Sequence, residues 1–151
     1  MHTMKPQDTV DFHIRWAWTK MSKAYNAEAA RVGGTMPMGF TLLSIDKEGT
    51  PSTSLGPKMG MEPTSMSRIL NSLEDQGYIK RVPSKDDKRK MIVKLTPKGK
   101  KYRDLTREKV IHLNEQIHNV IPGKKLKVFF EVMTDINKLL DANNIFNGKK
   151  K

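Results

Sequence analysis

Small hydroxyl side chains and an arginine cluster just after Pro63. Thr64, Ser65 and Ser67 fall within the first turns of an expected helix, and Arg68 follows them. Small hydroxyls at the front of a helix allow close approach to the base edges and phosphates of duplex DNA. Arg68 can donate two hydrogen bonds to O6 and N7 of guanine, so it is the first candidate for base readout. The alternatives are ordinary helix capping by the hydroxyls and a solvated surface arginine.

The loop 84–90 holds a second group of polar residues. Arg89 has the size and charge to enter a minor groove, where a narrow A·T stretch attracts a guanidinium. Lys88 beside it is a further candidate contact. Asp87 can orient the Arg89 side chain through a charge-assisted pair, or it can simply form the turn.

Positive charge is concentrated around this loop. The chain carries 28 Lys plus Arg against 16 Asp plus Glu, a net charge of +12, and its sequence pI is about 9.9. Residues 78–103 hold 11 of the basic side chains and two of the acids. This segment is either an electrostatic footprint for phosphates or a solvated lysine-rich face.

Several classes of site and protein are excluded by the composition. Cysteine is absent, which excludes disulfide scaffolds, thiolate zinc sites and thiol-based redox sensors. His112 and His118 fall on roughly opposite faces of one expected helix, so no metal site is predicted. No phosphate loop or nucleophile motif occurs. We therefore expect neither an enzyme nor a cofactor.

The chain carries no signal for a membrane or for export. No apolar run approaches the roughly 18 residues of a membrane span. Residues 1–8 lack the basic-then-apolar pattern of a signal peptide. We expect a cytoplasmic protein with no membrane partner.

Hydrophobic periodicity predicts the elements that position these groups. Asp8 is expected to cap the first helix, and Gly77 to end the helix that carries Arg68. Gly56-Pro57 weakens the segment before that helix, where Ser52 is an N-cap candidate and the helix is expected to be short or irregular. The expected helices cover 8–31, 37–47, part of 50–60, 64–76, a segment from Pro97 to before Pro122, and a last one through 126–140, with strands at 78–82 and 91–95.

Two short helices followed by a basic hairpin are the parts of a winged helix-turn-helix. The predicted fold is mainly α with a small β-wing, in which this lobe is flanked by N- and C-terminal dimerisation helices. One chain of this length is too small to cover all the apolar stripes, so the terminal helices are expected to pack against a second copy. The predicted domains are 1–34, 35–100, and 101–151 with its basic tail.

Three motifs carry a family resemblance. They read EPTSMSRIL at 62–70, LEDQGYIKR at 73–81 and DKRKMIVKLTPKG at 87–99. Together they resemble the signature of the MarR (multiple antibiotic resistance regulator) transcription factors. The chain departs from the family pattern at Gly56-Pro57, where better helix formers are usual.

The resemblance implies a homodimer whose winged lobes read a pseudo-palindromic operator in double-stranded DNA. By this pattern Thr64, Ser65, Ser67 and Arg68 match the recognition helix. Asp87 and Arg89 match the wing-tip pair. The full set of candidate DNA contacts is Thr64, Ser65, Ser67, Arg68, Asn71, Arg81, Asp87, Lys88 and Arg89.

Many regulators similar to this chain release DNA when a small molecule fills a crevice near the dimer helices. A small aromatic or phenolic effector is therefore expected here. The candidate lining residues are His13, Trp16, Tyr25, Met36 and Phe40. The alternative for each is ordinary core or dimer packing.

The sequence thus predicts a dimeric, sequence-specific DNA-binding regulator of transcription, a repressor relieved by a small-molecule effector. Two alternatives stay open. One is a sequence-neutral nucleic-acid-binding or architectural protein. The other is a protein-interaction module that uses the basic hairpin.

Overall fold

The computed structural model describes residues 4–142 and 145–146. The chain forms two compact units, Met1–Lys109 and Val110–Lys151. The basic tail expected at 149–151 lies outside the described residues. No helix within the described part of the chain combines the length and the apolar character needed to cross a membrane.

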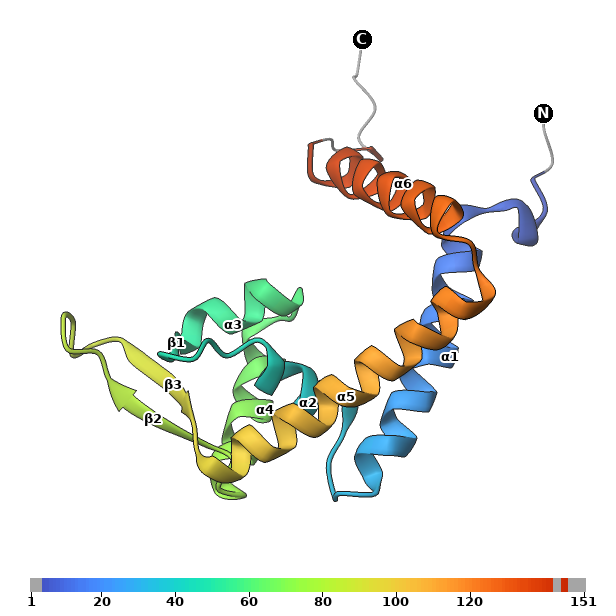
Figure 1. The fold of residues 1–151 in the computed structure, drawn as a ribbon. Helices are drawn as coiled ribbons and strands as arrows, with labels where there is room; N and C mark the ends of the chain where they lie inside the picture. The colour runs from blue at the N-terminus through green and yellow to red at the C-terminus, as the bar shows by residue number, and fades with distance from the viewer. Residues whose placement is uncertain (1–3, 143–144, 147–151) are drawn as a thin grey trace, which may run out of the picture. The chain divides into compact units, whose positions relative to one another are not determined.

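The first unit holds most of the elements, and α5 continues from it into the second (Figure 1). A mainly α protein with a small β-wing is confirmed. In chain order the elements are η1 (Pro6–Asp8), α1 (Val10–Ala30), α2 (Met36–Leu43), β1 (Thr50–Pro51), α3 (Ser52–Met59), α4 (Pro63–Asp75), β2 (Ile79–Pro83), β3 (Met91–Leu95), α5 (Pro97–Val120) and α6 (Gly123–Ala142).

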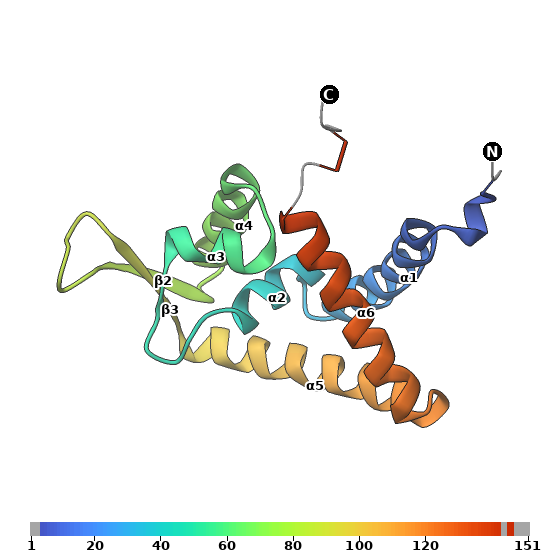
Figure 2. The same cartoon turned by 90° about the horizontal axis from the view of Figure 1, so that it is seen from above.

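The wing is an antiparallel hairpin of β2 and β3. Its register pairs Ile79 with Leu95 and Pro83 with Met91. β1 adds a third strand at the outer edge of β3, in the order β1-β3-β2. The two residues of β1 are too few to show a strand pattern, and the sequence did not predict it. The hairpin extends away from α3 and α4 in both views (Figures 1 and 2).

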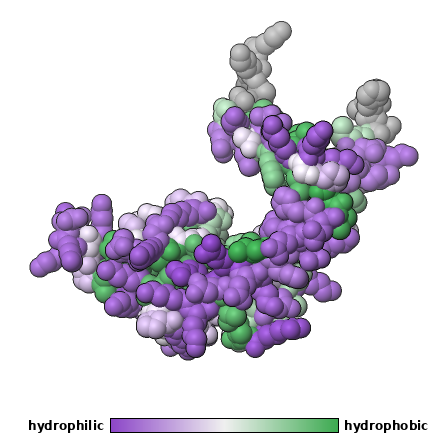
Figure 3. All heavy atoms as spheres, in the orientation of Figure 1, coloured by the Kyte–Doolittle hydropathy of each residue, from purple (hydrophilic) through white to green (hydrophobic). Residues whose placement is uncertain are grey.

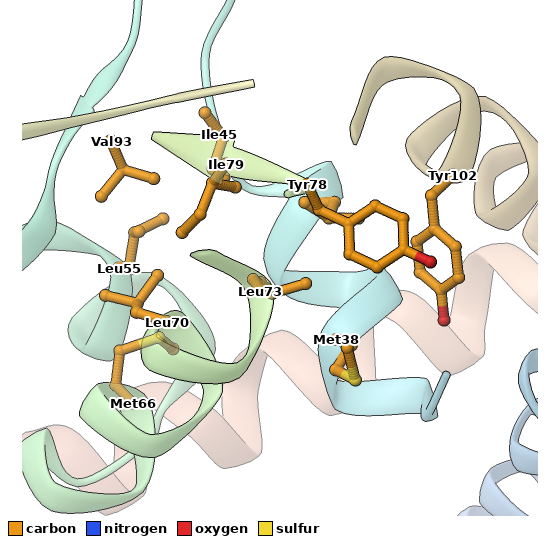
Figure 4. Packing of buried hydrophobic residues seen from close by; sticks show 11 residues of the cluster. Met38, Ile45, Leu55, Met66, Leu70, Leu73, Tyr78, Ile79, Val93 and Tyr102 are labelled. Carbon is orange, nitrogen blue, oxygen red and sulfur yellow. The ribbon is translucent and has the colours of Figure 1, made fainter. Parts of the chain in front are cut away.

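α4 follows the predicted pattern closely. Pro63 occupies its first turn, and Met66, Leu70 and Leu73 are buried in the lobe core (Figure 4). Gly77 takes φ = 77°, a left-handed conformation that favours glycine and reverses the chain into β2. The apolar face of α4 therefore fixes which of its residues face solvent.

Three helix boundaries differ from the sequence predictions. Asp8 does not cap α1, because residues 6–8 form a 3-10 turn and Thr9 takes the N-cap position. α2 ends at Leu43 rather than at residue 47, since Ile45 turns into the core. α3 is a regular helix of 8 residues despite Pro57, and its N-cap residue is Pro51 rather than Ser52. Its fully buried Leu55 shows that packing outweighs the poor local propensity.

The first turn of α5 packs directly on the chain reversal after α4. The hydroxyl of Thr96 donates to the carbonyl oxygens of Gly77 and Tyr78, at 2.6 and 3.1 Å. Gly99 lies against the same Tyr78 carbonyl, where a Cβ atom would overlap the oxygen. We call this contact the Tyr78 junction.

Aromatic packing extends the Tyr78 junction along α5. The rings of Tyr78 and Tyr102 lie 5.1 Å apart between centroids, and Figure 4 shows them side by side. Lys98 Nζ lies 4.6 Å from the centroid of the Tyr78 ring and donates to the carbonyl oxygen of Gln76 at 2.7 Å. Lys98 thus contacts both the C-terminal end of α4 and the Tyr78 ring.

Substituting Gly99 tests this junction. Gly99→Ala forces a methyl group against the Tyr78 carbonyl, and we expect the free energy of unfolding to fall by about 1 to 3 kcal/mol in urea denaturation. Gly123→Ala in α6 is the control, because a Cβ atom there meets nothing within 4 Å. That change is expected to be neutral or slightly stabilising. Equal effects of the two substitutions would show that the junction does not depend on close approach.

Candidate nucleic-acid interface

α4 presents one polar, solvent-exposed face. Its candidate contacts Thr64, Ser65, Ser67, Arg68 and Asn71 are all exposed. The helix has no side-chain N-cap bond, and within residues 4–142 and 145–146 the three hydroxyls make no hydrogen bond. The capping alternative for these hydroxyls therefore has no support in the geometry. The hydroxyls and the open amide groups of the first turn remain available to an external partner.

The tip of the wing carries an exposed arginine, Arg89, beside Asp87. The Arg89 side chain is 94% exposed, and its backbone N–H donates to Asp87 Oδ1 at 3.1 Å. The Nε atom of Arg89 lies 3.5 Å from the same oxygen. Asp87 therefore both forms the turn and pairs with the guanidinium. In Figure 3 hydrophilic residues, in purple, cover this end of the lobe, which includes the exposed Lys88.

Arg81 differs from the other candidates because its guanidinium is already bound. Arg81 Nη2 lies 3.0 Å from Glu74 Oε1, Arg81 Nε lies 3.2 Å from Glu74 Oε2, and the Arg81 backbone N–H donates to Oε2 as well. Nη2 also donates to Asn71 Oδ1 at 2.6 Å. The hydrogen bonds from Arg81 hold the pKa of Glu74 below its ordinary value. This Glu74–Arg81–Asn71 network ties β2 to the polar face of α4.

A cavity of about 230 Å³ lies between α1, α2 and the part of α5 in the first unit. Three of the five candidate effector residues, Tyr25, Met36 and Phe40, line it. His13 and Trp16 do not: His13 bonds to the carbonyl of Gln7, and Trp16 is half exposed. Both lie near the start of α1, more than two turns before Tyr25.

Further lining residues escaped the sequence prediction. A carboxylate of α1, Glu28, pairs with Lys109 of α5 at 2.8 Å and lies 3.6 Å from Arg31. Tyr102 contributes its ring, and its hydroxyl donates to the carbonyl of Thr35 at 3.4 Å. Because these residues come from segments far apart in the chain, no local pattern could have joined them. The complete lining is Tyr25, Glu28, Ala29, Arg31, Val32, Thr35, Met36, Gly39, Phe40, Tyr102, Leu105, Thr106 and Lys109.

The walls of this cavity are mostly apolar and aromatic. Tyr25 and Phe40 pack edge to face with ring centroids 5.5 Å apart. Burial raises the pKa of the Tyr25 phenol, so the hydroxyl stays neutral throughout the physiological range. No cluster of three His, Asp or Glu side chains suited to a metal ion occurs in the part of the chain that the structure describes.

Comparison with known protein families shows which family this lobe resembles. A model of the MarR family matches residues 35–91, which span α2 to the start of β3. Over these residues the chain is similar to the MarR family, and the resemblance carried by the three motifs is confirmed there.

Two curated relatives of this chain are regulators of transcription. YfiV of Bacillus subtilis, an HTH-type transcriptional regulator, is 28% identical over 126 residues, which cover 82% of this chain and 75% of YfiV. The HTH-type transcriptional regulator FarR of Neisseria gonorrhoeae is 29% identical over 80 residues. That match covers 53% of this chain and 55% of FarR.

Solved structures share the fold at lower identity. MepR of S. aureus, in complex with DNA, superposes with a TM-score of 0.80 at 16% identity, covering 87% of this chain and 98% of MepR. PcaV of Streptomyces coelicolor, in complex with its natural ligand, gives 0.77 at 17% identity and covers 94% and 99%. The winged helix-turn-helix architecture of this chain is thus confirmed.

The Glu74–Arg81 pair is expected to contribute to stability in a pH-dependent way. Because Arg81 lowers the pKa of folded Glu74, the stabilisation is complete above the unfolded-state pKa of about 4.3. It is lost as the pH falls through the lower pKa of the folded state. Glu74→Gln should therefore lower the free energy of unfolding at pH 7, by no more than about 1 kcal/mol for this partly exposed pair.

Urea unfolding of the wild type and of Glu74→Gln over a pH series measures this contribution. The two stabilities should converge once the pH falls below the lowered pKa of Glu74 in the folded state. Glu108→Gln, on the exposed face of α5, is the matched control and should leave the pH profile of the wild type unchanged. A deficit of Glu74→Gln that persists below the folded-state pKa of Glu74 would mean that the ion pair is not its cause.

Proposed function

We propose that this chain is a homodimeric, cytoplasmic repressor of the MarR family that occludes a pseudo-palindromic operator and releases it when a small aromatic or phenolic effector binds. The observation that carries the proposal is the pairing of two exposed features in one lobe. These are the hydroxyl and arginine face of α4 and the Arg89 wing tip.

The dimensions of α4 support operator binding. Its 13 residues form a helix about 20 Å long, which fits a major groove about 12 Å wide. Arg68 lies one turn into the helix, within reach of guanine in that groove. The wing tip supplies a guanidinium for the adjacent minor groove. MepR and the MarR protein of E. coli share this fold, and each has been captured with DNA.

Exposed apolar side chains support the homodimer. In a single chain, Trp16 and Trp18 of α1 are each about half exposed. Large exposed apolar side chains also occur on α6, namely Val128, Phe129, Phe130, Val132, Leu139 and Leu140. Patches of this kind are covered in stable proteins, and a second copy provides symmetric cover. Two lobes related by a two-fold axis would read half-sites about 34 Å apart.

The cavity of the first unit supports an effector. Its volume of about 230 Å³ suits a ligand of about one aromatic ring with a short substituent, and its walls are aromatic. PcaV and CouR, which share the fold, have been captured with a natural ligand and with p-coumaroyl-CoA respectively. Tyr102 lines the cavity and also packs on Tyr78 directly after α4. A ligand that shifts the Tyr102 ring would therefore act on the end of the recognition helix.

Arg68→Ala tests base readout. We expect this change to weaken binding to the cognate duplex by about 1 to 3 kcal/mol and to blur the preference for one base pair in each half-site. Lys101→Ala, on the exposed face of α5, is the control for phosphate contact alone. It should weaken all duplexes alike and flatten the salt dependence by about one unit if it meets a phosphate.

Competition binding at several salt concentrations, with a selected duplex and a scrambled one, gives both quantities. Equal losses on the two duplexes for Arg68→Ala would contradict base readout. A wild-type preference of no more than about tenfold would favour the sequence-neutral binder instead. Binding to an acidic protein that survives nuclease treatment would favour the interaction module.

Ala29→Phe tests the effector cavity. Ala29 lines the cavity, so a phenyl ring at this position should fill the space without reaching the polar face of α4. We expect 4-hydroxybenzoate at millimolar concentration to release the wild type from its selected duplex but not the variant. DNA affinity without the ligand should be unchanged.

The neighbouring residue provides the control for this test. Ala30→Phe introduces the same ring at an exposed position of α1 that does not line the cavity. This variant should respond like the wild type. Release of Ala29→Phe at wild-type ligand concentrations would place the effector elsewhere. No release of the wild type would exclude simple phenolic acids as effectors.

A further inference from the structure

We propose that Asn71 contacts DNA through its amide NH₂ group, as a donor, and that Glu74 and Arg81 are the positioning residues that turn the amide this way. The inference rests on the proposed function, in which the polar face of α4 enters the major groove. It adds that one residue of this face, Asn71, acts toward DNA as a hydrogen-bond donor.

The orientation of the Asn71 amide follows from chemistry. Arg81 Nη2 lies 2.6 Å from one terminal atom of the amide. A guanidinium can only donate, so the atom that faces it must be the carbonyl oxygen. The NH₂ group is then the part of the amide left for a partner outside the helix. In the described part of the chain, this group donates to no other residue.

The Arg81 guanidinium is itself fixed. Glu74 binds it through both carboxylate oxygens, at 3.0 and 3.2 Å, and accepts the backbone N–H of Arg81 at 3.2 Å. The Arg81 side chain is 25% exposed, and its backbone lies in β2, which pairs along its length with β3. Rotation of the amide of Asn71 would break the bond to Arg81 and bring two donors together. The pair therefore holds the amide in one of its two orientations.

Asn71 lies on the DNA-facing side of α4. It follows Ser67 by four residues and Arg68 by three, which places all three on one helix face. Asn71 is exposed like both of them. Its side chain therefore faces the same groove, about one turn farther along the helix than Arg68.

This orientation has a consequence for base preference. An asparagine that reads adenine uses both ends of its amide, the NH₂ group on N7 and the oxygen on the N6 amino group. At Asn71 the N6 amino group of adenine would have to share the amide oxygen with the Arg81 guanidinium. The NH₂ group alone suits an acceptor, which is N7 of either purine, guanine O6, thymine O4 or a phosphate oxygen, and none of these acceptors selects adenine over guanine. We therefore expect no preference for adenine over guanine at the position that Asn71 contacts.

Selection of duplexes from a random pool by the full-length wild type and by Asn71→Ala tests the donor role. Asn71→Ala should bind the wild-type duplex at least threefold more weakly. If the acceptor is a base, the variant loses a preference for guanine, for thymine or for purines at one position of each half-site. If it is a phosphate, the variant weakens all duplexes equally. Loss of a preference for adenine over guanine, or wild-type affinity for every duplex, would overturn the proposal.

Asn71→Asp separates the two ends of the amide. The carboxylate still accepts from Arg81 but has no donor, so binding should fall at least tenfold, more than for Asn71→Ala. Gln76→Glu adds the same charge at an exposed site at the end of α4 and is the control for repulsion by phosphates. If Asn71→Asp and Gln76→Glu lose the same amount of DNA affinity, the added charge alone explains the effect of Asn71→Asp, and the donor role is contradicted.

Glu74→Gln and Arg81→Ala test the positioning role. Arg81→Ala removes the donor and frees the Asn71 amide to rotate, whereas Glu74→Gln loosens the Arg81 side chain that holds the amide. Adenine should therefore become favourable at the Asn71 position, more for Arg81→Ala than for Glu74→Gln, while the preference set by Arg68 is kept. A structural defect would weaken both preferences together. If both preferences persist unchanged, the pair does not position Asn71. A wild type that selects no duplex at all would contradict the proposed function itself, whereas an effect of Arg68→Ala without one of Asn71→Ala would contradict only this inference.

Discussion

The close contact between the first turn of α5 and the peptide of Gly77 and Tyr78 is the constraint on which the lobe depends. The end of α4, the start of β2 and the start of α5 all meet there. Thr96 satisfies two carbonyl oxygens that the chain reversal leaves open, and the missing side chain of Gly99 allows the backbones to touch. The direction of α4 relative to the wing and to the start of α5 is thus set by contacts that the Thr96 hydroxyl and the Gly99 backbone make with the main chain of the reversal.

The same junction connects the cavity with the DNA-facing helix. Tyr102 forms part of the cavity wall and packs on Tyr78, which follows α4 by only a few residues. A contact between two aromatic rings contributes about 0.5 to 1.5 kcal/mol, and the coupling between two sites in a regulator is typically about 1 to 3 kcal/mol. In the proposed effector response, rearrangement of this one ring pair would supply a sizeable share of that coupling. Its effect would enter α4 at the C-terminal end, where Asn71 and Glu74 lie.

Short-range signals explain which parts of the fold the sequence predicts well. Pro63, Gly77 and the alternation in 91–95 act within a few residues, so α4 and the wing were placed correctly. The two-residue β1 arises from tertiary packing, and local propensity gives no signal for it. α3 is short, as predicted, but its regular form despite Pro57 also depends on packing. Separation along the chain also explains why most of the cavity lining was missed, because residues such as Glu28 and Lys109 come together only in the fold. The motif around Gly77 contained both Glu74 and Arg81, yet spacing alone does not show that they meet across the reversal.

Two of the three arginines among the candidate DNA contacts, Arg81 and Arg89, each have a carboxylate partner. Glu74 binds Arg81 and Asp87 contacts Arg89, so two of the basic residues that give this segment its excess charge are partly neutralised. For a protein that only gathers phosphates this arrangement is a disadvantage, since every neutralised cation weakens counterion release and non-specific affinity. For a protein that must distinguish sequences it is favourable, because a guanidinium or amide held in one direction rejects a wrong base by leaving a buried donor or acceptor unpaired. The pairing of arginine with acid at both the recognition helix and the wing therefore favours sequence-specific binding over the sequence-neutral alternative.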